Sequence, residues 1–271
     1  MAVQNSIVVI NYNSKDALAK MLAALDLEHA TTSEVIVVDS GSFDGSADFI
    51  RERYPTINLV QLPENRGWAA AANKGIAQAI AEIVVLCHAD IVAPIHNLVE
   101  LADKVREGAG RRIVAALPKL VDGDGAELPM VGRLPGIGSG AIGVFTPRFA
   151  RRMETPSLDH VQDHQWASLA CAAIDGGAVM KVGGFDERFF LYYADADLFA
   201  RLHEKSYRIS IRRDVSVVHT GDNPDESLPP HLARLMRKDQ QKYFEKHRPG
   251  WEQGVLKLDS KLFGLLKKDA G

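Results

Sequence analysis

Glu82–Val92 reads EIVVLCHADIV, an apolar run that ends abruptly in His88-Ala89-Asp90. The run is short, rich in β-branched residues and free of polar alternation, which is typical of a strand buried on both faces of a parallel sheet. His88 and Asp90 are two potential metal ligands at the end of that strand. Their role depends on what the rest of the chain brings to the same edge of the sheet.

The first 120 residues repeat this pattern, and helix-like stretches separate the apolar runs. Further buried-strand runs are SIVVIN (6–11), EVIVVDS (34–40) and INLVQL (57–62). The helix-like stretches are Lys15–Leu27, Ser46–Tyr54, Trp68–Ala81 and Ile95–Gly108. This alternation predicts an α/β fold with a doubly wound, mostly parallel sheet flanked by helices. Ligands bind such sheets outside the carboxyl ends of the strands, where Asn11, Asp39 and His88 stand.

The chain has 271 residues, a formal net charge of -3 and 2 cysteines. This length suits one large domain, or one domain with a small appendage. No basic stripe indicates nucleic-acid binding, and Cys87 and Cys171 are too few for a disulfide framework or a thiolate metal site. The N-terminus lacks the basic region of a signal peptide, and no stretch has the roughly 18 apolar residues of a membrane span. We therefore expect a cytoplasmic protein.

After Val121 the alternation loosens, and glycine and proline become frequent. VDGDGAELP (121–129) predicts a hairpin or tight turn, and GRLPGIGSGAIG (132–143) predicts a loop that serves as a lid or acceptor wall. RISIRRDVSVVHTGD (208–222) predicts two short strands, and Pro229–His247 predicts an amphipathic helix.

Loops at the carboxyl edge have both a structural and a functional interpretation. Asp39 is followed by SGSFDGS (40–46), which is either an ordinary turn or a loop where a base or ribose binds the Asp39 carboxylate. Asn65 and Gly67 form a turn, whereas Arg66 between them is placed to meet a phosphate. The sheet is not predicted to bind a dinucleotide, because the first strand runs into NYNSKDA without a Gly-x-Gly-x-x-Gly turn.

Asp90 and His219, which ends the run VSVVH, could hold one divalent ion with a diphosphate completing its ligands. Carboxylate and phosphate oxygens suit Mg²⁺ or Mn²⁺, and an imidazole favours Mn²⁺. Asp195 and Asp197 in YYADADLFAR either stabilise the start of a helix or face the crevice. In the second case Asp195 is a general base, with its pKa raised beside the aromatic sequence FFLYY.

Four motifs occur in order along the chain: VVINYNS (8–14), VVDSGSFDGS (37–46), ENRGWAAAANKGI (64–76) and VGGFDERFFLYYADADLFAR (182–201). Together they resemble the inverting family 2 glycosyltransferases of the GT-A, Rossmann-like fold. The resemblance extends over about Ser6–His219 and is greatest to a rhamnosyltransferase-like branch, whose first strand runs into Asn-Tyr-Asn. It implies a nucleotide-sugar donor and a role in cell-wall or polysaccharide biosynthesis.

The resemblance also implies a role for each matching residue. Asp195 would be the catalytic base that deprotonates an acceptor hydroxyl, so that the sugar is transferred with inversion. Asp90, His219 and His88 would hold the divalent cofactor, Mn²⁺ or Mg²⁺. The nucleotide-binding residues would be Asn11, Asn13, Asp39, Gly41, Ser42, Asn65, Arg66, Gly67 and Asn73. The acceptor side would be formed by Asp197, Tyr193 and Gly177.

The sequence departs from the family pattern in three places. His88 replaces the usual Asp or Asn of the metal motif, and Ala194 replaces the usual Glu beside the base. The Gln-x-x-Arg-Trp motif of processive synthases is missing, which predicts transfer of a single sugar, with a UDP- or dTDP-linked donor favoured by the resemblance. The alternatives are a catalytically inactive nucleotide-sugar-binding protein of the same fold and a nucleotidyltransferase.

We expect a catalytic domain over residues 1–225, with its acceptor side from about residue 121, and a C-terminal helical extension over residues 226–271. In VLKLDSKLFGLLKKDAG (255–271) leucines form one face and lysines its rim. That face fits the inner, anionic surface of a membrane, or else the protein's own domain or a second copy in a homodimer. The acceptor would be a carbohydrate, a lipid-linked compound or another hydroxyl compound.

Overall fold

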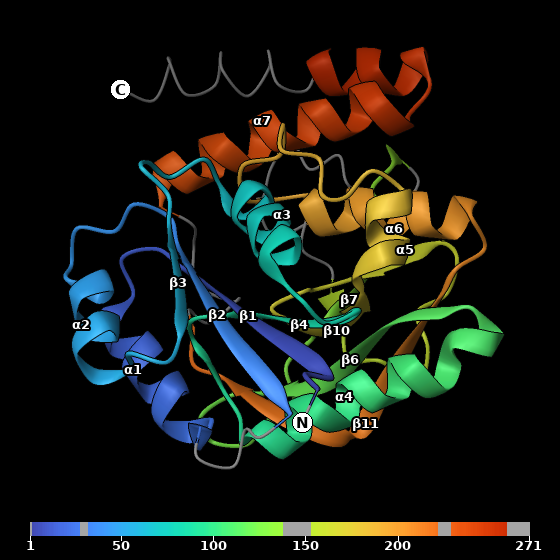
Figure 1. Cartoon of the computed structure of the whole chain (residues 1–271). Coiled ribbons are helices and arrows are strands. Elements are labelled where there is room, and N and C mark those ends of the chain that lie inside the picture. Colours follow the sequence, from blue (N-terminus) through green and yellow to red (C-terminus); the bar gives the residue numbers. More distant parts are fainter. Residues whose placement is uncertain (1, 28–31, 138–152, 222–228, 259–271) are drawn as a thin grey trace.

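The computed structural model describes the chain except for residues 1, 28–31, 138–152, 222–228 and 259–271. Its core is one large mixed sheet between layers of helices (Figure 1). The large sheet contains β1 (Asn5–Asn11), β2 (Ser33–Asp39), β3 (Asn58–Gln61), β4 (Ile83–His88), β5 (Ile91–Val92), β6 (Ile113–Val121), β10 (Cys171–Asp175) and β11 (Arg208–His219). A small sheet contains β7 (Val131–Arg133), β8 (Met153–Glu154) and β9 (Gln165–Ala167).

The helices are α1 (Lys15–Ala24), α2 (Ser46–Arg53), α3 (Trp68–Gln78), α4 (Ile95–Gly108), α5 (Gly176–Lys181), α6 (Ala194–Glu204) and α7 (Pro230–His247), with a 3-10 turn at Ala109–Arg111. Figure 1 shows α3, α6 and α7 above the sheet and α4 below it. Residues 250–258 form another helical segment after α7. None of the helices in the described part of the chain has both the length and the hydropathy of a membrane span.

The strand order of the large sheet is β3-β2-β1-β4-β10-β6-β11-β5. Strands β1 to β4 run parallel to one another, and β11 is parallel to β6. The antiparallel strand β10 lies between β4 and β6, so the sheet is mostly parallel, as predicted. Because β1, β2 and β4 are parallel and in register, Asn11, Asp39 and His88 end at one edge.

Helix α3 packs unusually close to the sheet because the side chains between them are small. Ala69, Ala71 and Ala72 are fully buried, and a Cβ on Gly75 would lie 2.2 Å from Val8. The glycine therefore allows a close approach of helix and strand that no other residue would permit without movement. This contact holds the second half of α3 against the middle of β1.

The predicted elements differ from the structure mainly in their ends. The four N-terminal helices all form, but α1 ends at Ala24 instead of Leu27 and α3 ends at Gln78 instead of Ala81. The turn predicted over 121–129 is confirmed by the bridge between Val121 and Glu127. Cys87 and Cys171 are both buried in the core.

The prediction of two short strands over 208–222 is wrong. Residues 208–219 form the single strand β11, whose pairing with β6 shifts in register between Arg212 and Ser216. Such an irregularity lets one strand accommodate extra residues while it keeps the same partner. The polar sequence Arg212–Asp214, which suggested a break, occupies this irregularity.

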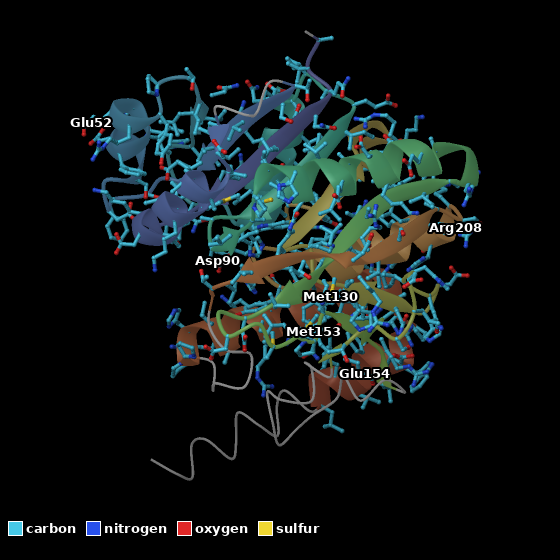
Figure 2. All side chains as sticks on the ribbon, turned by 90° about the horizontal axis from the view of Figure 1, so that it is seen from below. Glu52, Asp90, Met130, Met153, Glu154 and Arg208 are labelled. Atoms are coloured by element: carbon cyan, nitrogen blue, oxygen red, sulfur yellow. The ribbon has the colours of Figure 1, made fainter. Side chains whose placement is uncertain are left out.

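Two predicted segments lie partly outside the described residues. The loop predicted over 132–143 is described only as far as residue 137, and the leucine-rich C-terminal segment only as far as residue 258. Figure 2 shows the small sheet, with Met130, Met153 and Glu154, on the far side of β11 from Glu52. Arg208 and Asp90 lie near opposite ends of β11 in that view, which places Asp90 beside the end of the strand that carries His219.

Candidate active site

The passage of the chain from β4 to the neighbourhood of β11 brings His88, Asp90 and His219 together. The chain leaves β4 at His88, turns through Ala89 and Asp90, and crosses to β11 as the short strand β5. There Ile91 pairs with His219, and the backbone carbonyl of Asp90 accepts a hydrogen bond of 2.9 Å from the backbone N–H of Thr220. The turn that carries His88 and Asp90 therefore also places His219 beside them.

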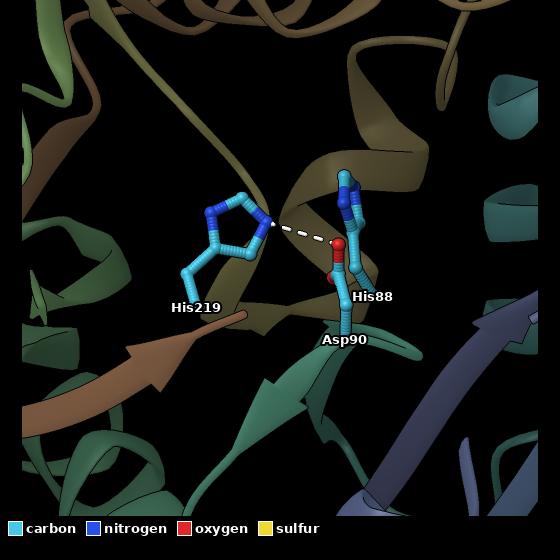
Figure 3. A group of neighbouring side chains, drawn as sticks. All are labelled: His88, Asp90 and His219. Atoms are coloured by element: carbon cyan, nitrogen blue, oxygen red, sulfur yellow. Dashed lines mark ion pairs between the residues drawn. The ribbon is translucent and has the colours of Figure 1, made fainter. Parts of the chain in front are cut away.

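The three side chains form a compact group of two imidazoles and one carboxylate (Figure 3). One ligand atom from each residue can be chosen so that all lie within 4.8 Å of one another. His219 Nε2 is 3.3 Å from Asp90 Oδ2, which is the ion pair drawn in Figure 3. The rings of His88 and His219 are 6.2 Å apart, with an interplanar angle of 69°.

The electrostatics of the group suit a cation. Burial lowers the pKa of His88 to about 4, so that its imidazole is neutral and keeps a free lone pair near pH 7. Burial alone would raise the pKa of Asp90, but the hydrogen bond from His219 and the electrostatic effects of the two neighbouring histidines together outweigh it and hold the pKa below its ordinary value. Asp90 is therefore an anion in a partly buried site, and its second oxygen, Oδ1, is buried without a hydrogen-bond partner.

The space around these residues also fits an ion. A Cβ on Gly221 would lie 2.3 Å from Asp90 Oδ2 and 3.1 Å from His219 Nε2, so any side chain there would fill the site. Two imidazole nitrogens and a carboxylate oxygen are a ligand set for borderline divalent metals, and oxygen-only sets suit Mg²⁺ better. The residues thus fit a divalent metal with open positions for a further ligand.

Asp39 lies at the neighbouring strand ends and organises the loop after β2. Its side chain is fully buried and accepts hydrogen bonds from Asn11 Nδ2 at 2.8 Å and from the Ser42 backbone N–H at 3.1 Å. Asn13 joins the same network: its N–H donates to Ser42 Oγ at 2.9 Å, and its side chain accepts from the Phe43 N–H at 2.9 Å. The structure thus brings these predicted nucleotide-binding residues together, and Asn11 Oδ1 is buried without a partner.

Residues 65–73 hold the segment before α6. Gly67 has φ +94, and a Cβ there would lie 2.3 Å from the Phe190 carbonyl oxygen. Asn73 Nδ2 donates to the Phe185 carbonyl and Asn73 Oδ1 accepts from the Phe185 N–H, both at 2.8 Å. Asn65 Oδ1 accepts the Gly67 N–H at 2.8 Å, which closes the turn at the start of α3.

Three residues of the predicted nucleotide set, Asn73, Gly67 and Gly41, therefore have structural roles. The amide of Asn73 is already used at both ends by the Phe185 backbone, so we assign it to holding this segment and not to the nucleotide. Gly67 permits the close contact with Phe190, and Gly41, at φ +71, similarly permits a close approach to the backbone of Glu64. Arg66 is exposed and pairs with Glu187 at 3.2 Å, an interaction that a phosphate could replace.

Replacing Gly67 with Ala is expected to lower the free energy of unfolding by about 2–3 kcal/mol, because φ +94 strains an L-residue and the methyl group overlaps Phe190. Urea denaturation of the purified variant measures this. Gly110→Ala is the matched control, since nothing lies within 4 Å of a Cβ at that position. Equal stability of the two variants would contradict the close packing of Gly67 on Phe190.

Trp68 connects this segment to the group of His88, Asp90 and His219, and the sequence analysis did not single it out. Its ring meets His88 edge-on at 5.7 Å and Phe185 at 4.8 Å, and its backbone N–H donates to the Phe190 carbonyl at 2.7 Å. The indole Nε1 is buried without a partner. The only sequence signal was its place in ENRGW, after a glycine at the carboxyl edge.

Asp195 lies in the first turn of α6 and is partly buried. Desolvation raises the pKa of its carboxyl to about 7, although a hydrogen bond of 2.9 Å from the Ala196 N–H acts in the opposite direction. A group with that pKa can accept a proton near neutral pH, as general bases do. The residue beside it is the buried Ala194, which has no carboxylate, so the motif supplies only one acidic group here.

The predicted acceptor side does not form as a group. Asp197 is fully buried and bound by Arg201, Lys246 and His247, with its Oδ1 2.7 Å from His247 Nε2, so we assign it to an internal ion-pair cluster. Its pKa stays below the ordinary value, since these partners outweigh the effect of burial.

Gly177 lies at the wrong edge of the sheet for an acceptor role. It follows Asp175, which pairs with Ile83 at the amino end of β4, whereas His88 is at the carboxyl end of that strand. The sequence analysis placed Gly177 with Tyr193 because both belong to neighbouring motifs, but the antiparallel direction of β10 separates them. Tyr193 does precede α6, with φ +66, and its ring lies 5.6 Å from that of Tyr243.

Comparisons with known proteins agree with this geometry. A family model described as glycosyl transferase family 2 matches residues 6–164, more than half of the chain. The chain belongs to glycosyltransferase family 2. It is 29% identical over 253 residues to the N-acetylglucosaminyl-diphospho-decaprenol L-rhamnosyltransferase of Mycobacterium tuberculosis, covering 83% of this chain and 80% of that protein. The family match and the relatives together identify the chain as a glycosyltransferase that uses a nucleotide-sugar donor.

Solved structures show the same fold. S. aureus TarS 1-349 in complex with UDP-GlcNAc has a TM-score of 0.59 at 18% identity, covering 96% of this chain and 71% of that one. The mannosyltransferase PcManGT from Pyrobaculum calidifontis, in complex with GDP-Man and Mn2+, has a TM-score of 0.57 at 20% identity, covering 96% and 74%. The expected GT-A fold is therefore confirmed.

Proposed function

We propose that this glycosyltransferase moves a single sugar, with inversion, from a UDP- or dTDP-linked donor to an acceptor hydroxyl. The observation that carries the proposal is the group His88, Asp90 and His219, with ligand atoms within 4.8 Å of one another at the carboxyl edge of the sheet. Parallel sheets of this kind bind ligands at that edge. The absence of a processive motif in the sequence supports transfer of one sugar at a time.

The nucleotide would bind beside Asp39, since β2 ends next to β1 and β4 at this edge. Asp39 holds Asn11 and the loop after β2 in place, and this network would form the wall against which a base lies. Arg66, which pairs with exposed Glu187, is available to a phosphate.

His88, Asp90 and His219 would hold the divalent ion, which when bound supplies positive charge against the charge that grows on the departing diphosphate. The neutral imidazole of His88 and the anionic Asp90 are both in the state that a metal requires. Because the set contains two imidazoles, we infer that it prefers Mn²⁺ to Mg²⁺.

Asp195 is the proposed base. The acceptor oxygen forms a bond to the anomeric carbon while the bond from that carbon to the diphosphate oxygen breaks, and the hydroxyl proton passes to Asp195. Attack from the face opposite the diphosphate inverts the configuration. The Asp195 carboxyl, with a pKa of about 7, is ionised in a sizeable fraction of molecules near neutral pH and is still basic enough to take the proton.

The nucleotide assignment is tested by calorimetric titration with UDP, dTDP and GDP, each with Mn²⁺, with Mg²⁺ and with a chelator. We expect UDP or dTDP to bind more tightly than GDP, and Mn²⁺ to strengthen binding more than Mg²⁺. Preferred binding of GDP would overturn the choice of donor. Equal binding with and without metal would overturn the metal's contact with the diphosphate.

Two observations favour a second candidate, a nucleotide-sugar-binding protein without catalytic activity. The metal motif begins with His88, and buried Ala194 leaves Asp195 without a neighbouring carboxylate. This candidate predicts binding of the nucleotide sugar without release of the nucleoside diphosphate, even when acceptors are supplied. Release of the diphosphate that depends on Asp195 would exclude it.

The acceptor is proposed to be lipid-linked, as the name of the M. tuberculosis relative states for that protein. The helical segment 250–258 exposes Trp251, Val255 and Leu258, with 65%, 40% and 60% of their surface accessible. Such a face could meet the inner membrane surface or a second copy. Flotation with anionic vesicles tests the first partner, and light scattering of the free protein tests the second.

A further inference from the structure

We propose that Asp239, on α7, is a positioning residue that holds the backbone before α6 so that Asp195 faces the acceptor. The inference rests on the proposed role of Asp195 as the base. Helix α7 lies outside the residues that the family model matches, and Figure 1 shows it running across the end of the molecule over α3 and α6.

The carboxylate of Asp239 is fully buried and binds the loop directly. Its Oδ2 accepts hydrogen bonds from the backbone N–H groups of Leu191 and Tyr192, at 3.2 and 3.1 Å. Its Oδ1 accepts from Lys242 Nζ at 2.9 Å, and the same ammonium group donates to the carbonyl of Arg188. One carboxylate and one lysine of α7 therefore hold three peptide groups of the loop before Asp195.

The loop needs such support because its last residue is strained. Tyr193 adopts a left-handed conformation, with φ +66, immediately before α6 begins. A non-glycine residue in that region persists only when its surroundings hold it there. The N–H groups that bind Asp239 belong to the two residues before Tyr193, so this contact fixes the direction in which α6, and Asp195 with it, begins.

Three ion pairs of α7 fall on both sides of this loop. Lys246 bridges Asp186 and Asp197, at 2.7 and 2.6 Å, and His247 binds Asp197 at 2.7 Å. These ion pairs fasten the segment before the loop and the first turn of α6 to the same helix. Asp239 binds the chain between these two places, at Leu191 and Tyr192, shortly before Asp195.

Loosening the loop should change the chemistry of Asp195 as well as its position. Desolvation is the main cause of the raised pKa of Asp195, so admission of water would bring that pKa down. The titratable groups beside the loop include Glu187, Arg188 and Tyr193 on its own segment, Asp239, Lys242, Tyr243 and Lys246 from α7, and Arg66 before α3. The Tyr193 pKa is raised mainly by burial, with smaller effects of the charges on Asp195 and Asp239.

The test compares Asp239→Asn with Glu34→Gln in the full-length protein. Glu34 is also a carboxylate that accepts a backbone N–H, from Ile80 at 2.7 Å, but it lies at the opposite edge of the sheet. We expect Asp239→Asn to lower kcat by about 10-fold or more, since a displaced catalytic group loses rate steeply. The Kd for the nucleoside diphosphate with Mn²⁺ should stay within about 2-fold, and Glu34→Gln should change neither quantity.

A second readout does not depend on turnover. In protein labelled with ¹³C at the aspartate carboxyl carbons, the resonance that Asp195→Asn removes belongs to Asp195, and its titration gives the pKa directly. We expect a midpoint near the wild-type value in Glu34→Gln and a midpoint lower by about one pH unit in Asp239→Asn. An unchanged midpoint together with an unchanged kcat in Asp239→Asn would overturn the positioning role.

Failure of the inference can be told apart from failure of the proposed function. If wild-type protein releases no nucleoside diphosphate, or if Asp195→Asn remains active, the proposed base is wrong. If Asp195→Asn is inactive but Asp239→Asn behaves like Glu34→Gln, only the positioning role is wrong. Should Asp239→Asn not fold, Lys242→Met keeps the carboxylate, removes the ammonium group that holds it and is compared in the same way.

Discussion

Replacing Asp195 with asparagine is expected to lower kcat by about 10²–10⁴-fold, which is the contribution of a positioned general base. The affinity for the nucleotide sugar should not change, because the proposed nucleotide and metal residues are untouched. Release of nucleoside diphosphate under saturating donor, with the acceptor supplied, measures kcat, and calorimetry measures donor binding. A variant that keeps more than about a tenth of the wild-type kcat would show that another group takes the proton.

The pH dependence provides an independent check of the same residue. Asp195 must be ionised to accept a proton, so kcat of the wild type should rise with pH through about 7 and then level off. The sign for stability is opposite: the folded protein holds this proton more tightly than the unfolded chain, whose pKa is near 3.8, so the carboxylate's contribution to stability falls between about pH 4 and 7.

The opposite pH dependences of kcat and of stability make it possible to distinguish loss of the base from loss of the fold. Above pH 7 the folded protein holds a charged, desolvated Asp195, whereas an asparagine there carries no charge. The variant should therefore be at least as stable as the wild type at pH 8. If Asp195→Asn were markedly less stable at that pH, its low activity would not identify a base.

The sequence was sufficient to predict the sheet and its functional edge, because both follow from local patterns. Buried parallel strands read as short β-branched runs, and polar residues at their ends stand out, as His88 does after IVVLC. The grouping of Asp90 with His219 was also predicted. The sequence did not predict the two-residue strand β5, which brings Asp90 next to His219, because a strand that short gives no pattern.

The errors arose where a residue's role depends on partners far along the chain. Asp197 pairs with Arg201 four positions later, but its other partners, Lys246 and His247, lie about fifty positions away and no local pattern indicates them. Gly177 was misplaced because a motif gives no direction for its strand, and β10 runs antiparallel. Asp239 was missed for the same reason as Asp197, since a lone aspartate in an amphipathic helix usually faces solvent.

Replacing Asp90 with asparagine is expected to weaken binding of the preferred nucleoside diphosphate in Mn²⁺ by at least about 10-fold, and to remove most of the difference between Mn²⁺ and a chelator. Asp90 supplies the negative charge of the group, and an amide is a far weaker ligand for a divalent ion. Titration calorimetry with and without Mn²⁺ measures both effects. Paramagnetic resonance of Mn²⁺ with the protein alone measures the metal without the nucleotide.

Asp103→Asn is the matched control, since Asp103 is a half-buried aspartate on α4 that pairs with Arg106, away from the site, and its loss should leave Mn²⁺ binding unchanged. His219→Ala should resemble Asp90→Asn, because it removes another ligand from the same group. His88→Asn decides how the site uses its unusual residue: if His88 binds the ion, its loss should weaken Mn²⁺ more than Mg²⁺, because an imidazole favours the softer metal. Metal-dependent binding that survives in Asp90→Asn would place the ion elsewhere and leave the Asp90–His219 contact as an ordinary ion pair.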